Sequence, residues 1–190
     1  MDLINYKIIQ AANFAAQKHK KQIRKDKKTP YIAHILAVSL LVMYQKNSNL
    51  NCVISSILHD TIEDTDTKIY EIEKLFGKKI ASIVVELTDE KNVPIGNRKK
   101  YSIKKVKDYS KEAALVKFCD ILCNIEDLRM QIIENISIIY TFNSTIKEKI
   151  EFEKKRIKQF NKYHKEINTS EVEKCLNAIK SYLVKKDLYK

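Results

Sequence analysis

The chain has 190 residues, of which 44% are hydrophobic and 32% are charged, with a formal net charge of +12. This composition excludes a disordered chain, and the length is enough for one domain with its own core. Only two glycines and two prolines occur, fewer than many short strands would need in their turns, so we expect an all-α fold. No run approaches the ~20 apolar residues that span a membrane, and the N-terminus lacks a signal-peptide layout.

Cysteine spacing indicates the redox environment of the protein, and its net charge indicates the kind of partner it binds. The four cysteines form no CxxC pair, so we expect core residues and a reduced, cytoplasmic environment. The positive charge indicates an anionic partner, but charge alone leaves nucleic acid, a membrane surface and a polyphosphate nucleotide open. An AT-rich genome can also inflate the use of lysine.

Hydrophobic periodicity predicts a series of helices joined by short polar loops. A basic loop over 20–28 separates the first two, and Pro30 is typical of a helix start. The segment 31–44 is apolar on almost every face, so we expect a buried helix there. In chain order, the expected segments are 3–21, 31–44, 52–58, 67–76, 80–87, 98–107 and 111–130.

Two further helices are expected to close the chain. Capping boxes with a hydroxyl and a glutamate three residues later, at Thr145 and Ser170, indicate where each begins. Gly77 is the expected end of the segment before it. We therefore expect one single-domain helical bundle over 1–190, with its core at about 6–165 and a C-terminal helix at about 170–187.

Charged residues directly follow the apolar segment 52–58. On a continuous helix, His59 would lie one turn from Glu63, and Asp60 one turn from Asp64. Burying several negative charges is costly unless a positive charge neutralises them, and a divalent cation would do so. The alternative is a solvated acidic helix end with His59 as an ordinary core histidine.

Two more polar residues interrupt apolar helices. His34 is a lone histidine within 31–44, and Asp120 lies between apolar neighbours in 111–130. Together with His59 and Asp60 they form a mixed imidazole and carboxylate set, which suits Mn²⁺, Fe²⁺ or Zn²⁺ and leaves coordination positions for water. Metal-bound water becomes a nucleophile at neutral pH. Glu63 and Asp64, one turn further on, are then candidates for general acid and base catalysis.

At these residues the chain resembles the hydrolase domain of the RelA/SpoT family, and specifically its small stand-alone, Mesh1-like members. The resemblance covers about residues 6 to 130 in order. The stretches that carry it are Ala11-Ala12-x-Phe14-Ala15-Ala16-x-Lys18-His19, Arg24-Lys25-Asp26, Thr29-Pro30-Tyr31-Ile32-x-His34, Leu58-His59-Asp60-Thr61-Ile62-Glu63-Asp64, Glu86-Leu87-Thr88-Asp89 and Leu115-Val116-Lys117-x-x-Asp120-x-Leu122-x-Asn124.

The resemblance implies an HD-domain bundle that binds a metal, usually Mn²⁺, through positions 34, 59, 60 and 120. It implies that Glu63 and Asp64 are the catalytic acidic pair and that Arg24, Lys25 and Asn124 contact the substrate. The implied reaction removes pyrophosphate from the ribose 3′ position of (p)ppGpp, an alarmone of the stringent response, giving GDP or GTP. A hydrolase without synthetase activity is expected. One possible role is to neutralise a toxin that is itself an alarmone synthetase, by hydrolysing the product of that synthetase.

The chain departs from the family pattern in several places. Ile35 stands where a proline often follows the first histidine, and Ile121 where a basic residue usually follows the last aspartate. The region after residue 130 does not match clearly, so the family's basic and aromatic substrate-binding pair has no counterpart to assign.

Two rival functions remain from the residues. Another HD-domain phosphatase, acting on NADPH or another nucleoside phosphate, would use the same metal core. A basic helical nucleic-acid-binding protein fits the net charge, but aromatics are sparse in the lysine-rich segments. It would also leave His34, His59 and Asp120 unexplained, so no nucleic acid is expected as a partner.

Overall fold

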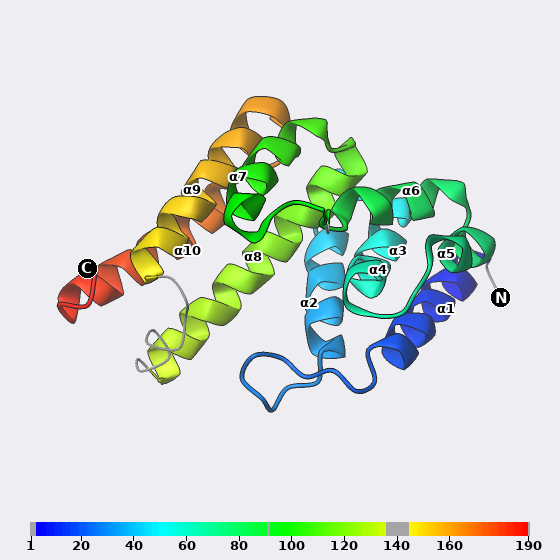
Figure 1. The fold of residues 1–190 in the computed structure, drawn as a ribbon, viewed down its shortest axis with the longest axis horizontal. Coiled ribbons are helices and arrows are strands. Elements are labelled where there is room, and N and C mark those ends of the chain that lie inside the picture. The colour runs from blue at the N-terminus through cyan, green and yellow to red at the C-terminus, as the bar shows by residue number, and fades with distance from the viewer. Residues whose placement is uncertain (1–2, 91, 136–144, 190) are drawn as a thin grey trace. The chain divides into compact units, whose positions relative to one another are not determined.

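The computed structural model describes residues 3–90, 92–135 and 145–189, and within these ranges the regular elements are helices (Figure 1). No strand forms in the same ranges, apart from an isolated antiparallel bridge between Ile23 and Pro30. The all-α prediction is confirmed. In chain order the helices are α1 (Leu3–Lys18), α2 (Ile32–Met43), α3 (Leu50–Leu58), α4 (Thr61–Asp64), α5 (Ile69–Phe76), α6 (Lys78–Leu87), α7 (Ile95–Lys105), the 3₁₀ turn η1 (Val106–Asp108), α8 (Lys111–Glu134), α9 (Ile146–Tyr163) and α10 (Ser170–Lys185).

The chain divides into two compact units. The first contains Met1–Lys91 and Tyr109–Asp120, and the second contains Asn92–Asp108 and Ile121–Lys190. The boundary falls inside α8, so the first part of that helix belongs to the unit that carries His34, His59 and Asp60. The domain bounds expected from the sequence, with a core at about 6–165, stay a prediction.

Helix α3 is the centre of the first unit and packs against α1, α2 and α6. Every residue from Cys52 to Leu58 is buried, because apolar or small side chains occupy all its faces. Asn49 caps its start by accepting a hydrogen bond from the backbone N–H of Cys52 at 3.0 Å. A buried helix held on several sides fixes the direction in which the chain leaves it, and His59 and Asp60 follow immediately.

Helix α2 is less buried than its composition predicts. The face with His34, Ile35 and Val38 is buried, but Leu36, Leu40 and Met43 are 46–57% exposed. The expectation of a buried helix over 31–44 therefore holds for the inner face only. An apolar composition does not say how many neighbours a helix has, and α2 has an inner and an outer face.

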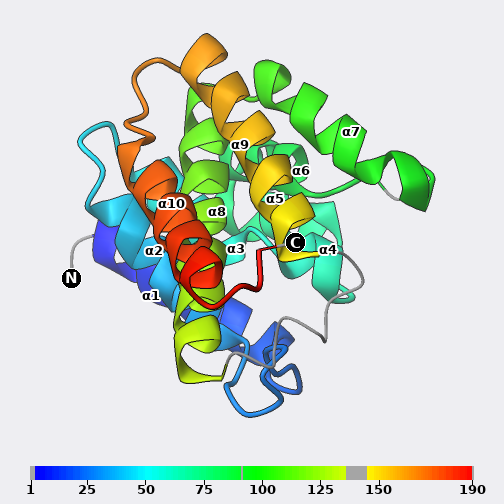
Figure 2. The same ribbon diagram turned by 90° about the vertical axis from the view of Figure 1, so that its left-hand side faces the viewer.

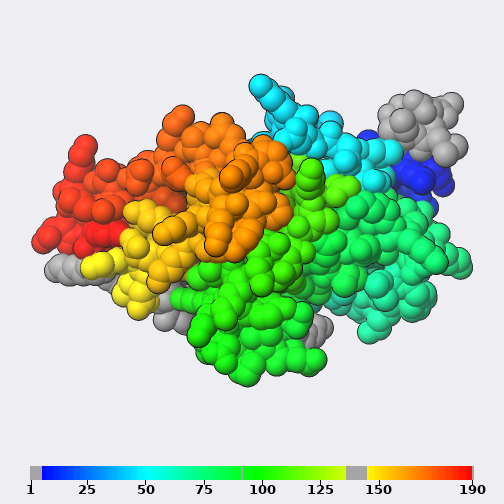
Figure 3. Space-filling view, turned by 90° about the horizontal axis from the view of Figure 1, so that it is seen from above, coloured from blue at the N-terminus to red at the C-terminus, as the bar shows by residue number. Residues whose placement is uncertain are grey.

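In the second unit α9 packs against α10, α7 and η1. Figure 2 shows α9 beside α10, and Figure 3 shows α7 along α9 on one face. His164, which follows α9, is buried and its Nε2 lies 2.8 Å from the backbone oxygen of Val106 in η1. The two closing helices expected from the sequence are present.

Helix ends test the predicted caps one by one. Gly77 ends α5 with φ of +94°, a backbone conformation that favours glycine. Thr145 and Glu148 form the reciprocal capping box at the start of α9. The box predicted at Ser170 is wrong, because Thr169 is the capping residue and Ser170 is already helical. Among the described residues, no helix combines the length and the apolar character that a membrane crossing requires.

Candidate metal centre

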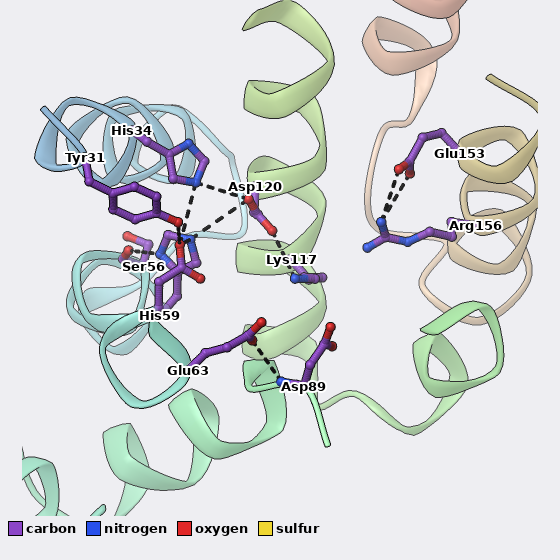
Figure 4. A network of polar contacts seen from close by, with 11 residues as sticks. Tyr31, His34, Ser56, His59, Glu63, Asp89, Lys117, Asp120, Glu153 and Arg156 are labelled. Atoms are coloured by element: carbon purple, nitrogen blue, oxygen red, sulfur yellow. Dashed lines mark hydrogen bonds and ion pairs between the residues drawn. The ribbon is translucent and has the colours of Figure 1, made fainter. Parts of the chain in front are cut away.

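His59 and Asp60 lie at a break between two helices. Helix α3 ends at Leu58, as expected for the segment 52–58, and α4 begins at Thr61, so no continuous helix runs from α3 to Asp64. Both junction residues nevertheless keep helical φ and ψ angles, and the N–H of Asp64 still bonds to the carbonyl of Asp60 at 2.9 Å. The imidazole of His59 points toward His34 of α2 and Asp120 of α8 (Figure 4).

The imidazole of His59 is fixed by the helix that precedes it. Its Nδ1 lies 2.7 Å from the backbone oxygen of Ser56, so Nδ1 carries a hydrogen and Nε2 is the ring atom that faces the cluster. The side chain is 1% exposed. Within the described residues, Nε2 forms no hydrogen bond of ordinary geometry, although Asp60 Oδ2 is only 3.0 Å away. Such an orphaned buried atom requires a partner.

His34 and Asp120 reach the same place from α2 and α8. His34 Nε2 lies 3.3 Å from Asp120 Oδ1, and His59 Nε2 lies 4.0 Å from that oxygen. One ligand atom from each of these three residues lies within 4.8 Å of the others. The structure thus brings together residues separated by 86 positions in the sequence, at the spacing of ligands around one ion.

Asp60 borders the same space. Its Oδ2 lies 3.8 Å from His34 Nε2 and accepts a 2.7 Å hydrogen bond from the hydroxyl of Tyr31. The Asp60 side chain is 16% exposed, so this is the side of the cluster nearest to solvent. All four predicted metal ligands therefore lie in one group.

The charges in the cluster depend on one another. Burial lowers the pKa of His59, but the carboxylates of Asp60 and Asp120 outweigh it and raise that pKa to about 9. Burial raises the pKa of Asp60, yet the neighbouring His59 brings it down to about 2. Burial likewise opposes ionisation of Asp120, and Lys117 with the two histidines holds its pKa well below the usual range.

This donor set fits a divalent cation. Two imidazole nitrogens and two carboxylates converge, and one of the nitrogens is buried without a hydrogen bond. Mixed nitrogen and oxygen ligands of this kind suit first-row transition metals. Histidines that bind metals commonly donate their other ring N–H to a carbonyl, and for His59 that carbonyl belongs to Ser56.

Glu63 and Asp64 lie just beyond the cluster, on α4. Glu63 Oε2 accepts a 2.9 Å hydrogen bond from the backbone N–H of Asp89, which follows α6. Burial raises the pKa of Glu63 above its ordinary value of 4.5. Asp64 is exposed, and its backbone oxygen accepts a hydrogen bond from the side chain of Gln22.

The predicted substrate-binding residues are spread more widely. Arg24 is half-buried in the basic loop, with its guanidinium carbon 5.8 Å from the centre of the Tyr31 ring, while Lys25 is exposed. Asn124 is exposed on α8, one turn after Asp120. It belongs to the second unit. Of the region after residue 130, which has no clear match to the family pattern, residues 136–144 lie outside the described residues.

Sequence reasoning assigned no role to two side chains that touch the cluster. Tyr31 bonds to Asp60, and Lys117 Nζ lies 3.0 Å from Asp120 Oδ2. Both lie in stretches that carry the family resemblance. Lys117 also stands three residues before Asp120, a buried carboxylate. That spacing on a helix was the available signal.

Comparison with known families explains the arrangement. The model of the HD domain family matches residues 11–169. The chain belongs to the HD domain family. HD domains bind divalent metals, and in this HD domain the cluster of His34, His59 and Asp120 is a group that could hold one.

Individual relatives agree with this family. A Xenopus tropicalis protein named guanosine-3′,5′-bis(diphosphate) 3′-pyrophosphohydrolase MESH1 is 44% identical over 124 residues, covering 64% of this chain and 69% of that protein. The human protein of the same name is 39% identical over 123 residues, with the same coverage. A solved metazoan SpoT ortholog, described as hydrolysing ppGpp, aligns with a TM-score of 0.70 and 25% identity over 96% of each chain.

Proposed function

We propose that this chain hydrolyses (p)ppGpp, releasing pyrophosphate from the ribose 3′ position and leaving GDP or GTP. The observation that carries the proposal is the convergence of His34, His59 and Asp120, with Asp60 beside them. Over 124 residues the chain is also 44% identical to a protein named for this reaction. Hydrolysis of a phosphoester requires stabilisation of the negative charge on its phosphate oxygens, which a cation held by these side chains would provide.

We infer that a divalent metal, Mn²⁺ by preference, binds to His34, His59, Asp60 and Asp120, with Fe²⁺ and Zn²⁺ as alternatives. When bound, such an ion supplies Lewis acidity and lowers the pKa of coordinated water. The protein supplies the orientation: Ser56 holds the His59 ring, Tyr31 holds Asp60, and Lys117 holds Asp120. The ring and both carboxylates are therefore placed before an ion arrives.

Glu63 is the proposed general base, with Asp64 as its partner. The Glu63 side chain is half-buried, and its raised pKa makes it a better proton acceptor than an ordinary glutamate. The N–H of Asp89 occupies Oε2, which leaves Oε1 to orient a water molecule or take its proton. Asp64 is exposed at the end of α4, where it can exchange a proton with solvent.

Substrate binding is assigned to Arg24, Lys25 and Asn124. Arg24 presents a forked guanidinium, which suits phosphate oxygens or a guanine edge. Lys25 adds an exposed positive charge beside it, and a net charge of +12 favours a substrate with four or five phosphates. Asn124 is the proposed amide contact, because its side chain is exposed one turn after Asp120.

NADPH is the second candidate substrate. The same cluster would serve a 2′-phosphate, so the pocket residues and not the metal ligands would decide between the two. We place the reaction in the cytoplasm, and propose functional pairing with an alarmone synthetase, since hydrolysis opposes alarmone synthesis.

The test is product analysis with purified protein. Protein loaded with Mn²⁺ is incubated with ppGpp or NADPH, and the products are separated by ion-exchange chromatography. Asp60→Ala removes a carboxylate of the cluster, while Asp66→Ala removes one that is 87% exposed and pairs with Lys18. We expect GDP and pyrophosphate from wild type and Asp66→Ala, and none from Asp60→Ala. Release of phosphate from NADPH alone would reject the alarmone assignment.

A further inference from the structure

Tyr31 connects the basic loop to the metal cluster. It directly precedes α2, and its hydroxyl donates a 2.7 Å hydrogen bond to Asp60 Oδ2 (Figure 4). The backbone N–H of the same residue donates to the carbonyl of Gln22 at 2.9 Å. One residue thus bonds on one side to a carboxylate of the cluster and on the other to the loop that carries Arg24.

The ring of Tyr31 is held between three neighbours. His19 stacks on it with ring centres 5.0 Å apart and planes at 22°, and His34 meets it edge-on at 5.6 Å. The guanidinium carbon of Arg24 is 5.8 Å from the ring centre. Such packing leaves the phenol little freedom, so its hydroxyl is directed at Asp60 without an ordering cost at the time of metal binding.

His19 and Gln22 extend the connection to the far end of α4. His19 is 2% exposed, and its Nδ1 lies 2.5 Å from the side-chain oxygen of Gln22. The amide of Gln22 in turn donates to the backbone oxygen of Asp64. The loop is therefore attached to both ends of the acidic segment, at Asp60 through Tyr31 and at Asp64 through Gln22.

We propose that Tyr31 is a positioning residue for the metal: it fixes the Asp60 carboxylate and makes the order of the loop over 20–30 depend on the occupied cluster. This inference rests on the metal site of the proposed function. A hydroxyl bonded to a carboxylate ligand fixes the direction of its remaining lone pairs, and loss of such a partner weakens metal binding by about 10- to 100-fold.

Tyr31→Phe tests the inference with little change of shape. The substitution keeps the stacked ring and removes only the hydroxyl. Tyr44→Phe is the matched control, because that ring is 86% exposed at the end of α2. Calorimetric titration of metal-free protein with Mn²⁺ needs no substrate. We expect Tyr31→Phe to bind Mn²⁺ about 10- to 100-fold more weakly than wild type, and Tyr44→Phe to bind it equally well.

Hydrogen exchange reports on the loop. The backbone N–H of Arg24 bonds to Thr29 at 2.7 Å, and that of Lys27 bonds to Arg24 at 2.9 Å. In wild type, saturating Mn²⁺ is expected to increase the protection of these loop amides more than that of the α6 amides. In Tyr31→Phe, the loop amides are expected to gain no more protection than the α6 amides. Gln22→Met, which loses both side-chain hydrogen bonds at similar size, is expected to lose the extra protection as well.

The outcomes separate this inference from the proposed function. Equal Mn²⁺ affinity in wild type and Tyr31→Phe would overturn the inference and leave ppGpp hydrolysis standing. Tyrosine-dependent Mn²⁺ binding by a protein that does not hydrolyse ppGpp would support the inference and reject the function. A wild type that binds no Mn²⁺ would overturn both.

Discussion

Lys117 Nζ lies 3.0 Å from Asp120 Oδ2, three residues apart on α8, with the two side chains 17% and 10% exposed. The contact holds one oxygen of Asp120, while the other lies 3.3 Å from His34 Nε2. A buried carboxylate is thereby shared between a fixed lysine on one side and the cluster on the other. Its charge is balanced before any metal binds.

Removing this lysine is expected to destabilise the metal-free protein. Lys117→Met leaves Asp120 buried without its nearest cation, which costs about 1–3 kcal/mol in the free energy of unfolding. A bound divalent cation would replace part of the lost charge, so the deficit is expected to shrink at saturating Mn²⁺. Urea denaturation with and without Mn²⁺ measures both values, and an equal deficit in the two conditions would contradict the proposed neutralisation.

Glu63→Gln is expected to separate catalysis from metal binding. The amide still accepts the hydrogen bond of Asp89 but no longer accepts a proton, so kcat is expected to fall by about 10²- to 10⁴-fold while Mn²⁺ affinity stays within a few-fold. Glu73→Gln, an exposed glutamate on α5, is the control. Loss of metal binding together with activity would show that Glu63 acts as a ligand instead.

The pH profile carries a related expectation. The pKa of Glu63 is raised above 4.5 by burial, and a general base works only when deprotonated. In the metal-free protein, NMR titration of the Glu63 carboxyl is therefore expected to give a midpoint above 4.5, and the base is lost as the pH falls through that midpoint. A midpoint at or below 4.5 would reject burial as the cause of the raised pKa.

Asp26 provides a pH probe of the basic loop. Hydrogen bonds from the hydroxyl of Thr29 and from the backbone N–H groups of Lys28 and Thr29 lower its pKa from 3.8 to about 2. A lowered folded-state pKa means that these bonds stabilise the loop above pH 3.8 and are lost as the pH falls through about 2. NMR titration of the carboxyl is expected to shift to higher pH in Thr29→Val, and an unchanged midpoint would reject the assigned cause.

The two glycines form a matched pair for backbone strain. A Cβ added at Gly77 or Gly96 meets no heavy atom within 4 Å, but only Gly77 has a positive φ, of +94°. Gly77→Ala is expected to lower the free energy of unfolding by about 1–3 kcal/mol. Gly96→Ala, inside α7, is expected to raise it by about 0.5–1 kcal/mol. Chemical denaturation measures both, and equal effects would show that φ is not the cause.

Part of the cluster could be predicted from the sequence because polar, ligand-type residues occupy positions where packing favours apolar ones. His34 and Asp120 stand where an apolar helix would favour leucine, and the structure places them 3.3 Å apart. The start of a new helix at Thr61 could not be predicted, because His59 and Asp60 keep helical angles and the pattern does not change.

Contacts between residues far apart in the sequence could not be predicted from local patterns. The bond from Tyr31 to Asp60 depends on the start of α2 meeting the end of α3, which no local pattern encodes. The cap of α10 was misplaced by one residue because Thr169 and Ser170 are adjacent hydroxyls of similar capping preference. The exposure of the outer face of α2 could not be predicted either, because an apolar sequence does not show which faces of a helix have packing partners.

Four side chains, from α2, α8 and the α3–α4 junction, are proposed to bind one metal ion. Anomalous diffraction from crystals grown with Mn²⁺ tests it most directly. We expect a single strong peak within bonding distance of His34 Nε2, His59 Nε2 and carboxylate oxygens of Asp60 and Asp120, and no such peak in Asp120→Asn. A peak elsewhere, or none at this cluster in fully folded protein, would contradict it.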